Sequence, residues 1–525
     1  MTLPLVFLTG ASVLILEILG TRVISPFYGS TVYVWSALIV VTLASLAAGY
    51  ALGGALADRA SNACPKDAQS HGPSGPWDRG GPRKSVSMML AASGAWLLLV
   101  PLFRRPVLLA ASSLGVQAGA LASAAALFAV PLACLGAVGP LCIRLRTEAL
   151  DRLGREVGWV NAVSTVGSVA GALLAGFWLI PRLPVSAALL CLAAALLGAA
   201  ILFGWSLMRP GARVAAVSAA ALGAGLAAAA SSAPRPPGGG VLREHARSFY
   251  GDIRVVDRPS RGRRTLFIDG VANTVVDLGT LDSTSRYIMA FEVLPLFRPE
   301  GKRALLIGLG GGALVARFKE HYGVATDVVE IDPVIERLAR AWFAFKPSGR
   351  VFTEDGRMFL ERGGDAYDFI VIDAFNGDQH PYHLFSREAF AAASRRLAPG
   401  GVLALNAIGF AEGPEDGLKR SVAATLKAVF RHVRVAAARS FRGDGGDCVN
   451  MMFFASDAPL DFARSAPAGR PELAAYAAEF DALSLESDGG VVSTDDRNPI
   501  EALSAPAFLA MRRDLWLGEK ERMAD

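Results

Sequence analysis

Hydrophobic residues are distributed in two different patterns along the chain, and the pattern changes near residue 232. Before that point the apolar stretches are long enough to cross a bilayer, for which about 20 residues are needed. We expect six such spans and a seventh, Ala-rich and only marginally hydrophobic, at Val214–Ser231. The six are Pro4–Ile24, Tyr33–Ala57, Val86–Phe103, Gln117–Ile143, Val157–Ile180 and Val185–Leu207. Residues 1–231 are therefore predicted to form a transmembrane helical bundle of six or seven spans.

Small residues within two spans indicate how the bundle packs. Gly49 and Gly53 in the second span, and Gly167 and Gly171 in the fifth, follow the small-xxx-small pattern that lets helices approach closely. The first span carries Glu17, and a carboxylate in lipid is costly. It is expected either to pair with an arginine or to belong to a polar path through the bundle.

After the bundle the pattern becomes that of a smaller β region and then an α/β domain. Residues 232–240 are rich in Pro and Gly and are predicted to be a linker. Residues 241–285 alternate as short strands, at Gly251–Arg258, Arg264–Ile268 and Thr274–Asp277, and form a small β domain. Residues 286–525 are assigned to a catalytic domain whose tail, Ala505–Asp525, is predicted to be a peripheral, solvated helix.

The stretch Ala304–Asp373 repeats a strand–turn–helix unit. An apolar strand runs into Gly308, Gly310, Gly311 and Gly312, and later strands end at Glu330, Asp355 and Asp373. This order is typical of a Rossmann-like doubly wound sheet, whose ligand lies at the carboxyl ends of the strands. The fold class expected is thus a transmembrane helical bundle plus α/β, with an open sheet of about seven strands of the S-adenosylmethionine-dependent transferase type.

The strand ends indicate an adenosine ligand. Gly308, Gly310 and Gly312 let the backbone come close to a ligand, and Glu330 lies where a carboxylate can accept from the ribose hydroxyls. Asp355, followed by Gly356, could accept from an adenine amino group. The glycine turn holds no basic side chain, which argues against a triphosphate and favours an adenosine carrying a cation, such as a sulfonium. An NAD-type domain and an inactive nucleotide fold stay open as alternatives.

Asp373 is the candidate catalytic residue. A carboxylate there can orient an attacking amine and take its proton, although Asp373 could instead simply cap the next element. His380 and His383 follow in the same loop, but no third Cys or His ligand lies nearby in the sequence. We therefore predict no metal.

Residues 241–410 resemble the spermidine synthase (polyamine aminopropyltransferase) family. The similar stretches are Ser248–Val255, Leu266–Val271, Tyr287 before Leu294–Leu296, the Gly308 turn, Glu330–Asp332, Glu354–Gly356, Asp373 and Leu384–Phe385. Together with the apolar spans and the stretch Thr494–Glu501, the whole chain looks like the membrane-fused members of that family.

The resemblance implies an activity: transfer of an aminopropyl group from decarboxylated S-adenosylmethionine to an amine, with release of methylthioadenosine. It implies that Glu330 holds the ribose, Asp355 the adenine, and that Asp373 is the base. The candidates for contact with the acceptor are Tyr250, Tyr287, Asn376, Asp378, Tyr382 and Asp495.

The chain departs from the family at the acidic, amine-binding half of the site. Gly311 replaces an acidic residue of the glycine turn, Asn376 replaces a second aspartate, and Gly251 and Ile288 stand where the family has amide or imidazole side chains. Two alternatives therefore stay open. One is methyl transfer, or other sulfonium chemistry, from intact S-adenosylmethionine; the other is a transporter or sensor that binds a nucleoside or polyamine without turnover.

Composition and charge support a membrane protein. Hydrophobic residues make up 52% of the chain and charged residues 19%, against about 25% charged in soluble chains. The net charge of +5 fits basic loops beside a bilayer better than nucleic-acid binding, which we do not expect. The five cysteines are scattered and form no disulfide framework.

The location of the catalytic domain follows from chemistry rather than from loop charges. Basic residues concentrate in alternate loops in a way that places the N-terminus inside, and seven spans would then put the domain outside. Because adenosyl donors are cytosolic, we expect a multi-pass protein of the cell's inner (plasma) membrane with a cytoplasmic catalytic domain. The expected partners are a small amine and the lipid bilayer, and a homodimer stays open.

Overall fold

The computed structural model describes most of the chain. It covers residues 2–29, 31–62, 80–147, 153–205, 240–375, 379–438, 448–462, 470–478, 480 and 486–517, with isolated positions at 211, 217, 218, 221 and 225. The chain divides into two compact units, Met1–Pro234 and Arg235–Asp525, which are treated separately below.

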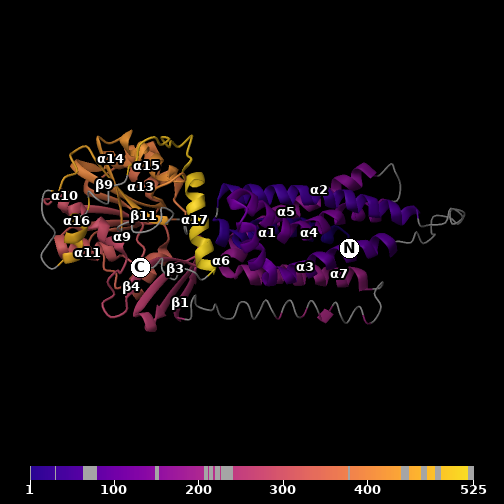
Figure 1. Cartoon of the computed structure of the whole chain (residues 1–525). Helices are drawn as coiled ribbons and strands as arrows, with labels where there is room; N and C mark the ends of the chain where they lie inside the picture. Colours follow the sequence, from indigo (N-terminus) through magenta and orange to yellow (C-terminus); the bar gives the residue numbers. More distant parts are fainter. Residues whose placement is uncertain are drawn as a thin grey trace, which may run out of the picture. The chain divides into compact units, whose positions relative to one another are not determined.

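Within the described residues, the first unit has six helices that are long and apolar enough to cross a membrane. They run alongside one another (Figure 1). The elements are α1 (Thr2–Tyr28), α2 (Val32–Asn62), α3 (Gly80–Ser112), α4 (Gly115–Arg146), α5 (Leu153–Leu173) with the π-helical η3 (Leu174–Leu179), α6 (Ile180–Arg182) and α7 (Val185–Gly204). These helices coincide with the six main apolar segments expected from the sequence. Most of the seventh, Val214–Ser231, lies outside the described residues.

Both small-residue patterns lie at helix crossings, as predicted. In α2 the pattern Gly49–Gly53 faces α4, where a Cβ on the second glycine would lie 2.4 Å from the carbonyl oxygen of Ala137. In α5 the pattern Gly167–Gly171 faces α1, and a Cβ on its second glycine would lie 2.3 Å from the carbonyl oxygen of Ala11. In each pair the two helix backbones can approach this closely only because the glycine at the crossing has no side chain.

The outer surface of the first unit is apolar. Leu102, Phe177 and Leu202 are 75%, 68% and 72% exposed, which is typical of helix faces that meet lipid rather than water. Glu17 in α1 is half-buried, and it forms no ion pair with any described residue. The arginine partner that the sequence suggested for it is therefore not found in this part of the chain.

The second unit begins with an antiparallel four-stranded sheet, in the order β1-β2-β3-β4. Its strands are β1 (Val241–Arg247), β2 (Asp252–Arg258), β3 (Arg263–Ile268) and β4 (Val271–Asp277), with the short 3-10 turn η6 (Pro259–Arg261). Three of these were expected. Strand β1 was missed because its sequence, Val-Leu-Arg-Glu-His-Ala-Arg, carries many charges and it pairs with β2 through an irregular register.

The larger sheet has seven strands, in the order β10-β11-β9-β8-β5-β6-β7. Strands β5 to β9 are parallel, and β10 and β11 are antiparallel. The strands are β5 (Arg303–Ile307), β6 (Ala325–Glu330), β7 (Val351–Thr353), β8 (Tyr367–Ile372), β9 (Leu397–Phe410), β10 (His432–Ala437) and β11 (Cys448–Ser456). This is the doubly wound α/β fold expected from the sequence.

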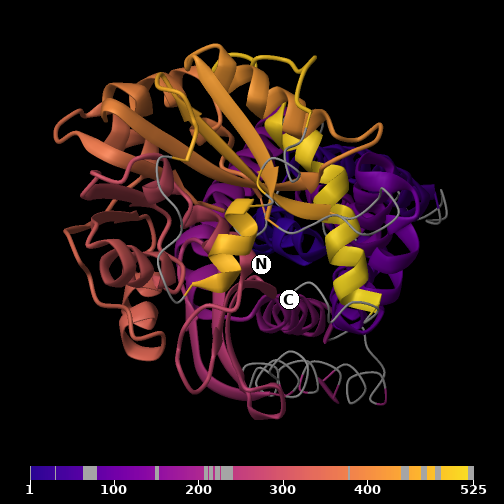
Figure 2. The same cartoon turned by 60° about the vertical axis from the view of Figure 1, so that its left-hand side comes forward.

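Helices cover both faces of the larger sheet (Figure 2). Successive residues of β5 point to opposite faces, so that Ala304 and Leu306 join one hydrophobic core and Leu305 and Ile307 the other. The helices are α9 (Arg286–Phe291), α10 (Leu294–Phe297), α11 (Ala313–Tyr322), α12 (Pro333–Trp342), α13 (Gly356–Glu361), η7 (Tyr382–Leu384), α14 (Arg387–Arg395), α15 (Gly417–Lys427), α16 (Pro471–Ala478) and α17 (Ile500–Leu517).

The C-terminal helix differs from its prediction. We expected a peripheral, solvated helix from Ala505, but α17 begins at Ile500 and packs against β9, β11 and α15. Ile500 and Phe508 are fully or almost fully buried. The sequence misled because the arginines in this helix suggested a solvated face, whereas its apolar residues contribute to the second unit's core.

The two neighbouring glycines of α2 test the close crossing. Gly53→Ala should lower the unfolding temperature of the detergent-solubilised chain, because its Cβ would meet the Ala137 backbone. Gly54→Ala should leave it unchanged or raise it, because a Cβ there has nothing within 4 Å and alanine favours a helix by about 1 kcal/mol over glycine. Equal effects of the two substitutions would contradict the crossing.

Candidate active site

The candidate residues meet at the carboxyl ends of the parallel strands. The chain passes from β5 outward to β6 and β7, then returns to β8 on the other side of β5. This reversal of strand order is the place where doubly wound sheets bind ligands. The glycine turn follows β5, Glu330 ends β6, Asp355 follows β7 and Asp373 follows β8.

The glycine turn is shaped by its neighbours on both sides. Gly308 has φ +91°, and a Cβ there would lie 2.3 Å from the carbonyl oxygen of Asp373, so only glycine fits. Its N–H donates to the carbonyl of Val329 at 2.9 Å. The turn is thus held between the end of β6 and the start of the Asp373 loop.

Glu330 is held by backbone N–H groups. Its carboxylate accepts from Leu309 N–H at 2.8 Å, within the glycine turn, and from Asp332 N–H at 2.9 Å. Burial raises the pKa of Glu330, against the lowering by these two hydrogen bonds. Each carboxylate oxygen keeps a lone pair, so the group can still accept from a ligand's hydroxyls.

The small β domain reaches this cluster through Ser248 and Tyr250. The Ser248 hydroxyl donates to Asp332 at 2.5 Å. Burial, and then the charges of Asp332, Asp355 and Glu330, raise the pKa of the Tyr250 hydroxyl, so this hydroxyl lies within the electrostatic field of the three acids.

Asp355 has two partners. It caps α13 by accepting from Met358 N–H at 3.0 Å, and its other oxygen lies 3.1 Å from Nε2 of His383. The next residue, Gly356, begins α13 against β5, where a Cβ would lie 2.4 Å from Ile307. The glycine lets the start of α13, and with it Asp355, approach β5.

Asp373 lies in a strongly desolvated environment. Although its side chain keeps some exposure, burial raises its pKa to about 6, and a hydrogen bond from Asn406 Nδ2 at 3.1 Å acts in the opposite direction. Burial, and then the charge of Asp373, raise the pKa of Tyr287 well above its usual value, so the negative charge of Asp373 acts on the Tyr287 hydroxyl. Asp373 is therefore a carboxylate with raised basicity, as a general base requires.

Gly311 is closed off by its surroundings. Its N–H donates to the Thr274 hydroxyl at 3.0 Å, and a Cβ on it would lie 2.6 Å from the Thr274 methyl carbon and 3.2 Å from the Phe343 ring. No larger side chain fits there unless Thr274 moves. An acidic side chain, which the family has at this position, therefore has no room here, because Thr274 and Phe343 fill its place.

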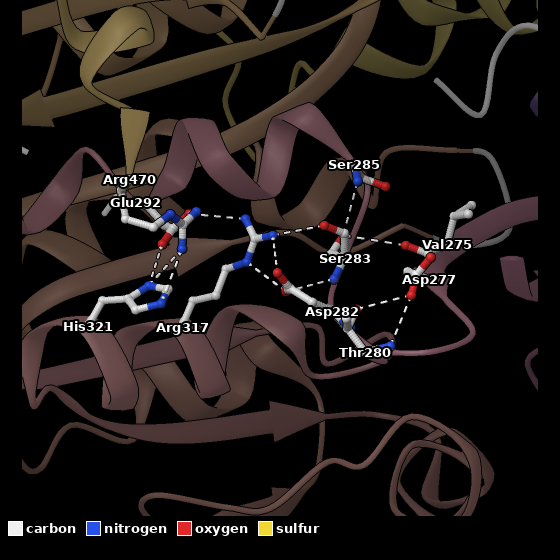
Figure 3. Close-up of polar contacts among 10 residues, drawn as sticks. All are labelled: Val275, Asp277, Thr280, Asp282, Ser283, Ser285, Glu292, Arg317, His321 and Arg470. Carbon is white, nitrogen blue, oxygen red and sulfur yellow. Dashed lines mark hydrogen bonds and ion pairs between the residues drawn. The ribbon is translucent and has the colours of Figure 1, made fainter. Parts of the chain in front are cut away.

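Behind the glycine turn lies a buried ion-pair network (Figure 3). Glu292 is fully buried and accepts from Arg317 at 3.0 Å and from Arg470 at 2.6 Å, with a His321 ring nitrogen at 2.9 Å. Arg317 also binds both carboxylate oxygens of Asp282, each at 3.0 Å. The network joins the loop before α9, the end of α9, α11 and the residue before α16.

This network connects the two halves of the site. Arg317 belongs to α11, which starts directly after the glycine turn, and Glu292 directly follows α9, which carries Tyr287. Fixing α11 to α9 therefore fixes the distance between the donor side of the site and the Tyr287 side. Because Glu292 is enclosed by cations, it acts on the site only through these helices.

The remaining four predicted acceptor contacts are Asn376, Asp378, Tyr382 and Asp495. Asn376 and Asp378 lie outside the described residues. Tyr382 is 53% exposed, and Asp495 forms an ion pair with Arg357 at 2.8 Å, which holds the pKa of Asp495 below its usual range. The roles of these four residues in binding an acceptor stay predictions.

Asn406 and His380 were missed as partners of the site. His380 was considered only as a metal ligand, yet its Nε2 accepts from Ile408 N–H at 2.9 Å. Among the described residues, no three His, Cys, Asp or Glu side chains are grouped so as to hold a metal ion. Asn406 interrupts the buried apolar run of β9, and a polar residue inside a buried strand is a signal that marks it without saying what it contacts.

Glu292→Gln should destabilise the second unit strongly. Removing its charge takes the carboxylate partner from Arg470 and one of the two carboxylate partners from Arg317, which keeps Asp282, and breaking a buried ion pair typically costs about 3–5 kcal/mol. The control is Glu336→Gln, which breaks only the surface pair with Arg340 and should cost about 0.5 kcal/mol. Chemical denaturation of both variants measures the difference, and equal costs would contradict a structural role for the network.

Asp373→Asn should stabilise the protein at pH 8. The folded-state pKa of Asp373 is raised from 3.8 to about 6, so its contribution to stability is complete below pH 4 and is lost as the pH rises through about 6. The gain in the free energy of unfolding is at most about 3 kcal/mol, because the pKa is raised by about two units and each unit corresponds to about 1.4 kcal/mol.

Calorimetry at pH 8 and pH 4 checks this pH dependence. The gain from Asp373→Asn should be largest at pH 8 and vanish near pH 4. Asp257→Asn should change the stability in the opposite direction. The hydrogen bond from Arg264 lowers the pKa of Asp257, so removing this carboxylate should destabilise the protein at pH 8. A lower unfolding temperature for Asp373→Asn at pH 8 would refute the raised pKa.

Comparison with known proteins gives the same picture for part of the chain. The family model described as Spermine/spermidine synthase domain matches residues 285–439. A polyamine aminopropyltransferase of Vibrio vulnificus is 44% identical over 117 residues, which cover 21% of this chain and 39% of the relative. A probable polyamine aminopropyl transferase of Bifidobacterium longum is 26% identical over 287 residues, covering 51% of this chain and 63% of the relative.

A third relative has a different printed activity. An N-terminal histidine N-methyltransferase of Emericella nidulans is 31% identical over 205 residues, which cover 35% of this chain and 36% of the relative. The chain thus spans less than two thirds of the length of each of these three proteins. The residues matched by the family model lie in the part built on the seven-stranded sheet, so this part of the chain is similar to a spermine/spermidine synthase domain.

Proposed function

We propose that this protein is a membrane-anchored aminopropyltransferase. It transfers an aminopropyl group from decarboxylated S-adenosylmethionine to an amine and releases methylthioadenosine. The observation that carries the proposal is Asp373, a partly buried carboxylate with a pKa of about 6, in direct backbone contact with the glycine turn. The relatives from Vibrio and Bifidobacterium support it.

The donor would lie along the strand ends. Glu330, fixed by the backbone of the glycine turn, accepts from the ribose hydroxyls, and Asp355 accepts from the adenine amino group. Gly308, Gly310, Gly312 and Gly356 allow the backbone to approach it. The acids around Tyr250 also favour a cationic ligand over an anionic one, which fits a sulfonium and not a phosphate.

The reaction needs a neutral amine and a place for its proton. The nitrogen lone pair attacks the propyl carbon bonded to sulfur, the carbon–sulfur bond breaks, and its electron pair neutralises the sulfonium. The nitrogen then carries a positive charge, and it loses one proton to Asp373. Above about pH 6 Asp373 is ionised and can take that proton, whereas below this pH turnover should fall.

Methyl transfer from intact S-adenosylmethionine is the second candidate. The observation that favours it is Gly311, whose position is closed by Thr274 and Phe343, so that no carboxylate stands there for the amino group of an aminopropyl donor. The methyltransferase relative from Emericella aligns with 35% of this chain, at 31% identity. The same Asp373 chemistry would serve an attack on the sulfonium methyl.

The membrane location follows from the first unit. We infer a multi-pass protein of the inner (plasma) membrane, because six helices have the necessary length and composition, with the catalytic unit on the cytoplasmic side, where adenosyl donors are made. An alkaline-phosphatase fusion at Gly240 tests the side: activity of the fusion would place the catalytic unit outside.

The identity of the nucleoside product separates the two reactions. The purified chain is incubated with either donor and a panel of amines, and the nucleoside is identified by mass spectrometry. Methylthioadenosine from the decarboxylated donor is the expected product, and S-adenosylhomocysteine would establish methyl transfer instead. Asp373→Asn should reduce turnover by at least about 100-fold while nucleoside binding is kept. Nucleoside binding without any product in the wild type would refute both enzymatic proposals.

A further inference from the structure

The stretch Thr494–Glu501 is part of the family resemblance, yet it belongs to none of the strand ends that form the donor site. Its first five residues, here called the terminal turn, are closed by a hydrogen bond from Thr494 N–H to the carbonyl of Arg497 at 2.9 Å. Two side chains of the terminal turn, those of Asp495 and Asn498, reach the segment that follows the Asp373 loop.

The terminal turn holds this segment from one side. The amide nitrogen of Asn498 donates to the carbonyl of Tyr382, in η7, at 2.8 Å. The Ser386 hydroxyl, at the start of α14, donates to a carboxylate oxygen of Asp495 at 2.5 Å. Residues 382–386 are therefore tied at both ends to a turn that is 109 or more residues later in the chain.

Arg357 holds the same segment from the other side. It lies in the first turn of α13, two residues after Asp355, and its side chain is only 16% exposed. Its guanidinium donates to the carbonyl of His383 at 2.9 Å and to the Ser386 hydroxyl at 3.0 Å. It also donates to both carboxylate oxygens of Asp495, at 2.8 and 3.1 Å, a bidentate geometry that fixes the orientation of the guanidinium. Asp495 thus orients Arg357, and Arg357 holds the backbone of His383.

This arrangement fixes the imidazole of His383 beside Asp355. Nε2 of His383 lies 3.1 Å from Oδ2 of Asp355, and this nitrogen carries the hydrogen because a carboxylate oxygen only accepts. Oδ1 of Asp355 accepts from Met358 N–H at 3.0 Å. With one donor on each oxygen, the carboxylate cannot turn without losing a hydrogen bond. Its side chain is 27% exposed, so a ligand can reach the lone pairs that remain.

Resting on the proposed binding of an adenosyl donor at Asp355, we propose that Asp495, Arg357 and His383 are positioning residues that make the site specific for adenine. Asp495 holds Arg357, Arg357 holds the backbone of His383, and His383 fixes the carboxylate of Asp355. In this orientation the carboxylate accepts from the 6-amino group of adenine. The three residues act through Asp355 and not on the reacting atoms.

A fixed carboxylate distinguishes bases that a mobile one accepts. A purine with a 6-oxo group presents an acceptor where adenine presents its amino group, so two acceptors would face each other. Its nearest N–H lies one ring position away, at N1, and a carboxylate that is free to turn can reach it. A site built to hydrogen-bond one group rejects an analogue that lacks this group by a large factor.

The role proposed for Asp495 differs from that of an acceptor contact. Its two carboxylate oxygens are engaged by Arg357 and by the Ser386 hydroxyl. The hydrogen bond from Arg357 holds the pKa of Asp495 below its usual range. The negative charge of Asp495 is therefore already compensated, and it offers little to a cationic amine.

The base preference of nucleoside binding tests the proposal. The affinities of the full chain for methylthioadenosine and for methylthioinosine, its 6-oxo analogue, are measured by calorimetry. The wild type should bind the adenine compound at least about 100-fold more tightly. Asp495→Ala and His383→Met should each lower this ratio about 10-fold, the usual effect of losing one hydrogen bond to a charged group.

Two variants serve as matched controls. Asp496→Asn changes the next acid of the terminal turn, which is exposed and forms no hydrogen bond or ion pair with any residue that the structure describes, so the ratio should stay unchanged. His383→Gln keeps an N–H for Asp355 and should retain most of the wild-type ratio. If Asp495→Ala does not fold, His383→Met decides, because the side chain of His383 is 40% exposed.

Steady-state kinetics distinguish a donor role of Asp495 from an acceptor role. Asp495→Ala should raise the KM for the donor about 10-fold and leave kcat and the KM for the amine nearly unchanged. A raised KM for the amine with an unchanged KM for the donor would overturn the inference and assign Asp495 to the acceptor. A general structural role would weaken the binding of both nucleosides equally and leave their ratio unchanged, which would also overturn it.

The outcomes separate this inference from the proposed function. An unchanged ratio in Asp495→Ala and His383→Met, with methylthioadenosine still formed by the wild type, overturns the inference and leaves the aminopropyltransferase proposal intact. A wild type that prefers methylthioadenosine but forms no product overturns the proposed function, while the ratios of the variants still decide the positioning role. A wild type that binds neither nucleoside overturns both.

Discussion

The contact between Gly308 and Asp373 is the constraint on which the catalytic unit depends. The glycine turn and the Asp373 loop leave strands that are neighbours in the sheet, and their backbones touch where a Cβ would be only 2.3 Å from a carbonyl oxygen. Glu330 holds the other side of the same turn through Leu309. The donor side and the base are thereby joined by main chain, and their separation does not depend on flexible side chains.

The sequence predicted the parts of the site that lie at regular positions along the chain. Glycines after β5 and acids at the ends of the next strands follow a local pattern, and strand order then brings them to one edge. Asn406 and Thr274 could not be identified in this way. Each acts across a long sequence distance, and only the pairing of β8 with β9, or the position of β4 over the glycine turn, brings it to the site.

The same distinction holds for the fold. The glycine patterns of α2 and α5 predicted helix crossings because the spacing of small residues is itself the contact surface. Strand β1 was missed because its charged sequence has no alternating pattern, and α17 was misplaced because its burial depends on β9 and β11 rather than on its own residues. Tertiary packing decided both elements, and a single sequence does not reveal it.

The position of α17 has a consequence for the order in which the protein matures. The ring of His380, in the loop that follows Asp373, lies with its centroid 5.1 Å from that of Phe508, which is 128 residues later in the chain. One wall of this loop therefore comes from a helix that the ribosome makes after all the strands. A nascent chain can complete the sheet and its glycine turn and still lack this wall. Catalytic competence should therefore arrive as a late step of synthesis, after the spans of the first unit have been inserted.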